Sequence, residues 1–357
     1  SLRSLRRRYA ARLIVDVMCD RGNQMNQGEQ MNYFQQIIFN SRKNIKLLLK
    51  GSLCESLTAV ERKILFKRHV EIINLELSYQ CNRKCDYCPV EFSNRRSSQR
   101  YMDKELLLKI CGELAEIRYE NRISLNLYNE PLMDEYLEEK IRLIRDMLPH
   151  CHLAFNSNGD YLDAKRLHAL ADSGLNFICV TLHAPPNKVQ REKTIVKRIR
   201  KLFERLEHLD NSDRVLMEMA AGKTLTHINV RGVRVQVQWP DWRVVGSNRA
   251  GVLSDHESMS VIRMQPCSKP FREFTIFYDG NVQPCCEAFY DDTTDLASIG
   301  NAGTEPIFYL YTSKRLSGFR RGLFDFGQKT GICASCTVQD YSSEDENEER
   351  KFLLQEL

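Results

Sequence analysis

Between residues 71 and 250 the chain alternates short apolar runs with longer amphipathic segments. Six runs have the length and composition of strands: 72–78, 123–127, 152–155, 177–182, 215–219 and 233–237. Four segments space their apolar residues as helices do: 103–117, 133–147, 163–173 and 190–208. Strands that alternate with helices predict right-handed βαβ units and a parallel sheet, open or closed into a barrel. Ligands of such folds bind at the carboxyl ends of the strands.

The segments on either side of this region have a different character. Residues 1–70 are basic with helical character and predict an N-terminal extension. Residues 251–340 combine short strands, turn signals and cysteines, which predicts a small second domain of α+β type. Residues 341–357 are an acidic tail. We therefore expect four parts, divided near residues 70, 250 and 340.

Composition and charge narrow the class of protein. Hydrophobic residues make up 42% and charged residues 28% of the 357 residues, as in a folded globular chain. No apolar run has the length of a membrane span, and the stretch after Arg6–Arg8 is interrupted by Asp16, unlike a secretory signal. The basic excess lies in the first fifty residues rather than along the predicted core, which argues against a nucleic-acid partner. We expect a cytoplasmic protein without a membrane partner.

Seven of the thirteen cysteines fall into two spaced groups, which in a cytosolic chain indicates metal or redox chemistry. Cys81, Cys85 and Cys88 directly follow the first predicted strand with C-x3-C-x2-C spacing. Three thiolates can hold an iron–sulfur cluster and leave one iron open for another ligand. A zinc knuckle is the alternative, although no His or fourth Cys is near.

This motif resembles the signature of the radical S-adenosylmethionine (radical SAM) family, including the aromatic Tyr87 before the last cysteine. The resemblance covers residues 71 to about 340. It implies a partial (β/α)6 TIM-like barrel and a 4Fe–4S cluster whose open iron binds SAM. It also implies an external one-electron donor such as flavodoxin or ferredoxin. The cluster reductively cleaves SAM to a 5′-deoxyadenosyl radical in this family.

Further positions at the ends of consecutive strands match the SAM-binding segments of the family. Residues 128–131 resemble its Gly-Gly-Glu-Pro segment, with Asn129 in place of a glycine, and residues 156–159 resemble its Thr-Asn-Gly turn. His183 follows the fourth strand and is interpreted as a neighbour of the SAM ribose or as an acid–base group. The resemblance implies SAM contacts at Tyr87, Asn129, Glu130, Pro131, Asn156, Asn158, Thr181 and His183.

The second cysteine group lies in the predicted C-terminal domain and consists of Cys267, Cys285, Cys333 and Cys336. Its spacing resembles the twitch domain, the shortened form of the SPASM extension. The resemblance implies one auxiliary 4Fe–4S cluster that all four thiolates ligate. A zinc ribbon is the alternative, because two cysteine pairs can also form a zinc site. The neighbouring Cys286 is interpreted as a packed spectator or a thiol near the substrate.

A fully ligated auxiliary cluster is suited to accept an electron, so we expect an oxidation. The resemblance to twitch dehydrogenases indicates a small hydroxylated substrate such as a sugar or aminocyclitol. Two alternatives are a maturase that modifies a ribosomally made peptide and a non-catalytic iron–sulfur electron-transfer protein. Seven residues are expected on the substrate side: Arg95, Arg96, Arg100, Trp239, Asp241, Trp242 and Arg243.

Overall fold

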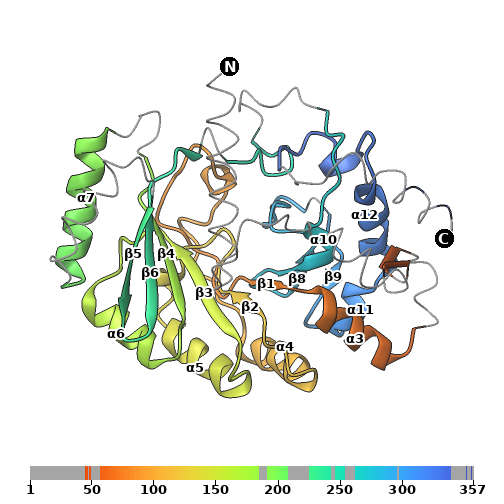
Figure 1. Ribbon diagram of the computed structural model, residues 1–357, viewed down its shortest axis with the longest axis horizontal. Coiled ribbons are helices and arrows are strands. Elements are labelled where there is room, and N and C mark those ends of the chain that lie inside the picture. The colour runs from red at the N-terminus through yellow and green to blue at the C-terminus, as the bar shows by residue number, and fades with distance from the viewer. Residues whose placement is uncertain are drawn as a thin grey trace, which may run out of the picture.

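The computed structural model describes residues 45–46, 48–49, 57–184, 191–207, 225–242, 246–253, 262–295, 297–338, 351 and 355. Its centre is a nine-stranded sheet in the order β5-β6-β4-β3-β2-β1-β7-β8-β9 (Figure 1). The strands are β1 Ile72–Leu75, β2 Arg122–Ser124, β3 His152–Ser157, β4 Phe177–Thr181, β5 Leu225–Val230, β6 Val233–Gln238, β7 Glu273–Ile276, β8 Asn281–Gln283 and β9 Gly300–Asn301.

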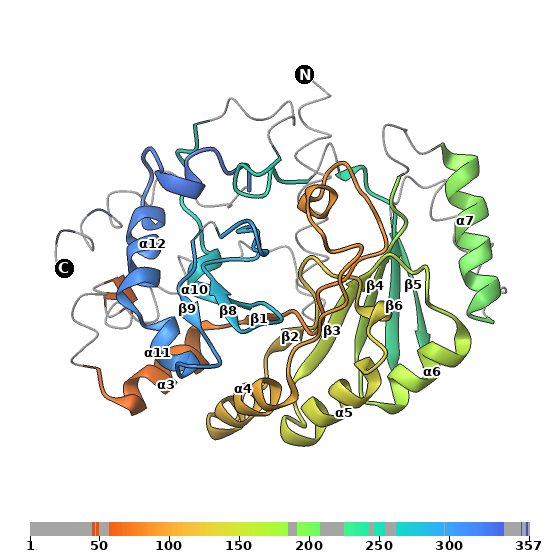
Figure 2. The ribbon, with the colours of Figure 1, turned by 180° about the vertical axis from the view of Figure 1, so that it is seen from behind.

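One side of the sheet is the predicted barrel-like part. Strands β1, β2, β3, β4 and β6 are parallel neighbours, and four helices connect or flank them. These helices are α4 Lys104–Glu116, α5 Leu137–Met147, α6 Ala164–Asp172 and α7 Glu192–Arg205. The predicted cap Asp103 starts α4 by accepting hydrogen bonds from the backbone N–H groups of Glu105 and Leu106. The helices lie outside the curved sheet, with α7 at its far end, so the predicted fold class is confirmed (Figures 1 and 2).

The outer edge of the barrel-like sheet, formed by β5 and β6, is antiparallel, whereas the sequence predicted parallel strands throughout. The predicted strand at 215–219 lies outside the described residues, and β5, which the pattern analysis missed, pairs antiparallel with β6. Arg231 and Gly232 join the two strands with φ angles of 46° and 86°. Two consecutive positive φ angles are typical of a tight hairpin turn. The alternating sequence of β5 has too little apolar character to be recognised as a strand of a parallel sheet.

The sheet continues into the second part of the molecule, because β7 pairs with β1 in parallel register, Ile73 opposite Phe274. Strands β8 and β9 extend it in antiparallel fashion. Four helices cover this end: α3 Ala59–His69, α10 Lys269–Arg272, α11 Ile307–Tyr311 and α12 Lys314–Phe324. Figure 1 shows α12 and α7 at opposite sides of the molecule. A single sheet therefore carries both predicted cysteine regions.

The hydrophobic core is also continuous across residue 250. Phe66 of α3 packs edge-to-face with Phe274, Phe308 and Tyr311, with ring centroids 5.2–5.3 Å apart. The last helix of the predicted N-terminal extension thus packs against the C-terminal part of the chain. The domain limits remain predictions, and the limit near residue 250 coincides with no break in the sheet or the core.

The two faces of the barrel-like sheet have different side chains. On β4, Ile178 and Val180 join the large core under the helices, whereas Cys179 and Thr181 face the other way. On β6, Gln236 and Gln238 are buried and donate hydrogen bonds to Cys179 and Thr181. The concave side of the sheet therefore combines buried polar groups with the small apolar cluster of Ala154, Phe177 and Cys179, which is typical of ligand-binding interiors. Among the described residues, no helix combines the length and apolar character that a membrane span needs.

Candidate active site

The first cysteine group lies on the loop that follows β1. Cys81, Cys85 and Cys88 are half-buried free thiols, and a short 3-10 turn, Pro89–Phe92, starts directly after Cys88. The Cys81 N–H donates to the Arg95 carbonyl at 3.1 Å, which closes the loop at its base. Burial raises the pKa of Cys81 to about 12 and that of Cys85 to about 11, and the neighbouring thiols add to the effect. The three thiols therefore lie near enough to one another for their charges to interact.

Polar contacts fix the segment between Cys81 and Cys85 to the end of β3. Arg83 forms a two-pronged ion pair with Asp160, with N···O distances of 2.5 and 2.8 Å. The Asn82 amide also donates to Asp160, at 2.9 Å, and accepts a hydrogen bond from the Asn158 amide at 2.7 Å. Asn158, a predicted SAM contact, thus has a structural task in holding the cysteine loop.

Glu130 is buried at the end of the segment that follows β2. Its carboxylate accepts hydrogen bonds from the Ser157 hydroxyl at 2.6 Å and the Asn158 N–H at 2.7 Å. Burial raises the pKa of Glu130 to about 7, although these donors oppose the shift. The carboxylate lies close enough to Cys81 to raise the pKa of that thiol further. A cation bound beside the first cysteine group would favour the ionised carboxylate.

The other predicted residues of this segment are internal. The Asn129 side chain donates to the Ser78 hydroxyl at 3.0 Å and so ties the ends of β1 and β2 together. Pro131 begins a 3-10 turn, Pro131–Met133, which Glu130 caps. The Asn156 N–H donates to the Asn126 side chain at 2.8 Å. The structure places all of these groups at the carboxyl ends of neighbouring strands, as predicted.

Tyr87 and His183 form a pair beside the cysteine loop. Their rings stack with centroids 5.8 Å apart, and the Tyr87 hydroxyl lies 2.5 Å from His183 Nδ1. Burial, with smaller contributions from Arg83 and Arg198, lowers the pKa of His183 to about 3. The imidazole is therefore neutral near pH 7 and is suited to hold the Tyr87 hydroxyl rather than to exchange protons with solvent.

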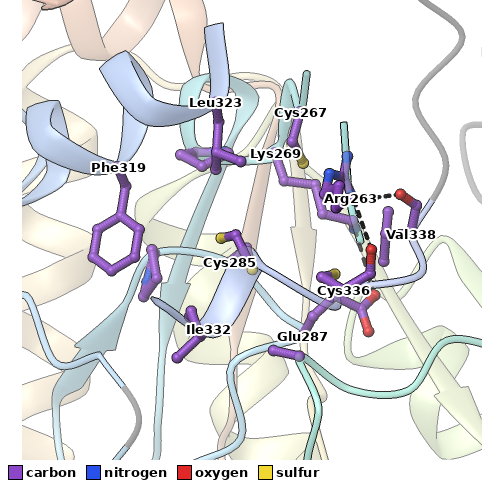
Figure 3. A pocket seen from close by; sticks show the side chains of 14 residues that line it. Arg263, Cys267, Lys269, Cys285, Glu287, Phe319, Leu323, Ile332, Cys336 and Val338 are labelled. Carbon is purple, nitrogen blue, oxygen red and sulfur yellow. Dashed lines mark hydrogen bonds and ion pairs between the residues drawn. The ribbon is translucent and has the colours of Figure 1, made fainter. Parts of the chain in front are cut away.

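The second cysteine group lines one cavity. Cys267 precedes α10, Cys285 follows β8, and Cys333 and Cys336 lie on the turn after α12, yet all four face the same space (Figure 3). Within the described ranges, no three His, Cys, Asp or Glu side chains come close enough to hold a single metal ion.

Two buried side chains hold the Cys333–Cys336 turn in place. The Arg263 guanidinium donates to the carbonyls of Pro266, Cys336 and Val338, and so joins this turn to the chain before Cys267. The Asn248 amide donates to the Ser335 carbonyl at 2.8 Å and accepts from the Thr337 N–H at 3.2 Å. Sequence reasoning missed both residues, because their partners are far away along the chain.

A buried group of charges borders the same cavity. Lys269 donates to Glu273 at 2.9 Å, lies 3.9 Å from Glu287, and contacts the Cys286 sulfur at 3.3 Å. Burial disfavours the ammonium ion, but Cys286 and the two carboxylates outweigh this and hold the pKa of Lys269 well above its usual value. Cys286 is therefore not a simple spectator, since it contacts a half-buried cation that lines the cavity of the four thiols.

Arg249 and Glu287 lie between the two cysteine groups. Their side chains form an ion pair of 3.1 Å, and the Ser247 hydroxyl also donates to Glu287. Arg249 is near enough to Cys88 on one side and Cys286 on the other for both thiols to influence its pKa. The Tyr128 hydroxyl bridges the same gap by donating to the Cys286 and Glu287 carbonyls at 2.9 and 3.2 Å. Sequence analysis did not predict that Tyr128, Arg249 and Glu287 would form a polar contact between the two cysteine groups.

The expected substrate side needs correction. Arg95 is fully buried and paired with Glu76 at 2.7 Å, so it cannot contact a substrate, because this carboxylate and two carbonyls occupy its guanidinium. Arg100 forms a two-pronged pair with Asp292, and Trp239 is buried. Asp241 and Trp242 are half-buried, Arg96 is exposed, and Arg243 lies outside the described residues.

The donor sets fit iron–sulfur clusters. Cluster iron is bound by cysteine thiolates, and a cluster with four irons takes four ligands. The second group supplies four thiols around one cavity, whereas the first supplies three thiols and leaves room for one further ligand. The polar concave face next to the first group, with Glu130 and Thr181 at the strand ends, suits a polar cofactor. This fold and these thiols define an iron–sulfur enzyme.

Two family models match the chain. The radical SAM superfamily matches residues 75–227, and an iron–sulfur cluster-binding domain, SPASM, matches residues 267–337. Residues 75–227 thus resemble the radical SAM superfamily, and residues 267–337 resemble its SPASM cluster-binding domain. These matches confirm the predicted cofactors, which are SAM, a 4Fe–4S cluster and an auxiliary iron–sulfur cluster. The assignment of individual residues to them remains a prediction.

Characterised relatives cover this chain to different extents. The S-adenosyl-L-methionine-dependent 2-deoxy-scyllo-inosamine dehydrogenase of Niallia circulans is 26% identical over 277 residues, 77% of this chain and 96% of the relative. A GTP 3′,8-cyclase of Nautilia profundicola is 30% identical over 125 residues, 33% of this chain and 36% of the relative. The crystal structure of BtrN in complex with AdoMet and 2-DOIA aligns with a TM-score of 0.57 and 24% identity, over 77% of this chain and 96% of that chain. That alignment shows a shared fold.

Proposed function

We propose that this protein is a SAM-dependent dehydrogenase that oxidises a hydroxyl group of a small polar molecule such as an aminocyclitol or sugar. The observation that carries the proposal is the position of Arg249 and Glu287 between the two cysteine groups. A substrate bound there would lie between a radical source and an electron acceptor. A buried carboxylate paired with a half-buried guanidinium is a suitable partner for hydroxyl and amino groups.

The residues divide into three tasks. Cys81, Cys85 and Cys88 would hold the first cluster, and the four thiols around the second cavity would hold the auxiliary cluster. When bound, SAM and the first cluster supply a hydrogen-abstracting radical, and the auxiliary cluster supplies a one-electron acceptor. Glu287 would accept a hydrogen bond from the substrate hydroxyl, and Arg249 would orient that carboxylate through their 3.1 Å pair.

Charge and homology support this assignment. Arg249 and Lys269 hold the pKa of Glu287 below its usual value in spite of its burial, so the carboxylate is ionised and can accept hydrogen bonds at neutral pH. The relative from Niallia circulans, which this chain matches over most of its length, is named for the oxidation of an aminocyclitol. The external electron donor and the cytoplasmic setting remain part of the proposal.

The experiment is anaerobic turnover with 2-deoxy-scyllo-inosamine, SAM and dithionite after iron–sulfur reconstitution. We expect about eight iron atoms per chain, 5′-deoxyadenosine, and a ketone product. A substrate deuterated at the carbon that is oxidised should transfer deuterium to 5′-deoxyadenosine. SAM cleavage with no oxidation of any aminocyclitol or sugar offered would contradict the proposal and favour the peptide-maturase alternative.

Glu287→Gln sharpens this test, and Glu120→Gln, an exposed residue on the molecular surface, is its matched control. Loss of a hydrogen bond to a charged group costs roughly 1.5–3 kcal/mol, which corresponds to about a ten- to hundredfold lower kcat/KM. SAM cleavage without substrate should be unchanged in both variants. Equal kcat/KM in Glu287→Gln and the unaltered protein would remove Glu287 from the substrate site.

A further inference from the structure

A second cavity, of about 260 Å³, lies on the outer side of the barrel-like sheet. It is bordered by the end of β4, the turn after β3, the first cysteine loop and α7. Four cationic side chains line it: Arg83, Arg198, Lys201 and Arg205. The carboxylate in its lining is Asp160, which is already paired with Arg83. The cavity therefore carries an excess of positive charge.

This cavity adjoins the predicted SAM site at one residue, Asn158, which lines it, but the rest of its lining belongs to the outer side of the sheet. Val180 and Leu182 line it, and these residues belong to the face of β4 that packs toward the helices. Thr181, between them in the sequence, faces the polar concave side and accepts a hydrogen bond from Gln238. Because successive residues of a strand point to opposite faces, the cavity opens on the outside of the sheet rather than on its interior.

Helix α7 extends the positive charge over the surface. It has six Lys or Arg residues and two Glu residues, and its apolar side, including Ile195 and Leu202, is buried. Lys193, Lys197, Arg200 and Lys201 are exposed, and Lys201 makes no hydrogen bond or ion pair with any described residue. Residues 198, 201 and 205 share one side of the helix, because they are three and four positions apart. Lys84 of the cysteine loop adds a further exposed cation.

We propose that this basic face, formed by α7 and the first cysteine loop, is the docking surface for an acidic one-electron-transfer protein. The inference rests on the proposed function, since it names the partner that reduces the first cluster. Arg83 lies between Cys81 and Cys85 in the sequence and lines the cavity, so a protein bound here would contact the loop that carries the first cysteine group. It would approach from outside and leave the concave side free for SAM and substrate.

The positive charge of this face indicates a partner with a negatively charged surface. Within the protein, the arginines of this face donate to backbone carbonyls. Arg205 donates to the carbonyls of Gly159 and Asp160, and Arg198 donates to the His183 carbonyl at 2.7 Å. Lys84 is paired with Glu91 at 3.4 Å, whereas Lys193, Lys197 and Lys201 of α7 form no ion pair with another described residue and are available to carboxylates of another molecule. Complementary charges of this kind raise the association rate about 10- to 1,000-fold, and the gain falls steeply as the salt concentration rises.

The test measures reduction of the first cluster by two reductants, an acidic flavodoxin in its reduced form and dithionite. In the doubly charge-reversed variant, Lys197→Glu with Lys201→Glu, the rate with flavodoxin should fall at least tenfold at low salt. The rate with dithionite should stay within about twofold, because a small reductant needs no docking face. Added salt should slow the unaltered protein and have little effect on the variant.

Lys314→Glu is the matched control. Lys314 is an exposed lysine at the start of α12, on the opposite side of the molecule, where a carboxylate is compatible with the helix dipole (Figure 1). Reduction by flavodoxin should be unaffected in this variant. If Lys314→Glu slows reduction as much as the α7 reversal does, or if the α7 reversal has no effect, the docking surface is refuted.

Carbodiimide cross-linking gives a measurement that does not depend on activity. Carboxylates of flavodoxin should link to Lys197 or Lys201 and not to Lys314, as mapped by mass spectrometry. Links on another face would overturn the inference. The proposed dehydrogenase function is tested by its own substrate assay with dithionite, so a protein that oxidises no hydroxylated substrate could still confirm the docking surface.

Discussion

The two cysteine groups of this protein are built in different ways. The first lies on one short loop, and polar side chains such as Asp160 and Asn158 fix that loop to neighbouring strand ends. The second collects its four thiols from three separate places in the chain around one cavity. The first is therefore specified largely by local sequence, and the second by tertiary structure. The first leaves a ligand position open, whereas the second supplies four thiols for a closed site.

The largest expected difference between the two cysteine groups is in which product disappears when a cysteine of each group is replaced. Cys85→Ala should reduce iron from about eight to about four atoms per chain and bring 5′-deoxyadenosine formation to background, because three ligands are needed to hold the first cluster. Cys336→Ala should also lose about four iron atoms and stop ketone formation, yet still release some 5′-deoxyadenosine. Iron analysis and chromatography of both products distinguish the two patterns.

Stability needs a control in this experiment, because a metal can contribute to the folding of a small domain. Circular dichroism and retained visible absorption of the first cluster must show that Cys336→Ala is folded. A folded Cys336→Ala protein that makes ketone at the normal rate would contradict an electron-accepting role for the second cysteine group. The auxiliary cluster would then be structural.

A smaller effect is expected from Lys269, the half-buried cation beside the second cysteine group. Lys269 stabilises negative charge in the cavity, and reduction of a cluster adds negative charge, so Lys269→Met should make the auxiliary cluster harder to reduce. We expect about a tenfold shift in the ratio of reduced to oxidised cluster at fixed potential, about 59 mV for one electron. A redox titration followed by electron paramagnetic resonance measures it.

Lys269→Arg preserves the charge and is the control for that titration. Its midpoint potential should remain close to that of the unaltered protein. The first cluster should keep its potential in both variants, because Lys269 borders the second cavity. An unchanged auxiliary potential in Lys269→Met would show that Glu273 and Glu287 already cancel its charge at the cluster.

The smallest effect concerns the anchoring of the first loop. Asp160→Asn removes the ion pair with Arg83, which is partly exposed and worth about 0.2–1 kcal/mol. Loss of the first cluster to an iron chelator should become about two- to fivefold faster, measured by visible absorption. Asp172→Asn, which removes a more exposed pair with Arg231, is the control and should change nothing. Equal rates for both variants would show that the loop needs no anchor.

The sequence was informative where the chemistry is local. The three cysteines lie within eight residues directly after a predicted strand, so spacing and periodicity were sufficient to find them. Glu130 was found through the resemblance of residues 128–131 to a known family segment. Arg249 and Glu287 could not be predicted, because a partner 38 positions away is invisible to a local pattern. The prediction that Arg95 contacts the substrate was wrong for a related reason. Its chemistry is typical of ligand binding, and its burial against Glu76 follows only from the fold.

Strand β1 has a consequence for the geometry of electron flow. It is hydrogen-bonded to β2 on one side and to β7 on the other, so both cysteine groups are attached to the same backbone element. The spacing between the two redox centres is then set by strand geometry rather than by a hinge. A substrate of the proposed dehydrogenase would therefore have to fit the separation that the sheet sets between the two cysteine groups.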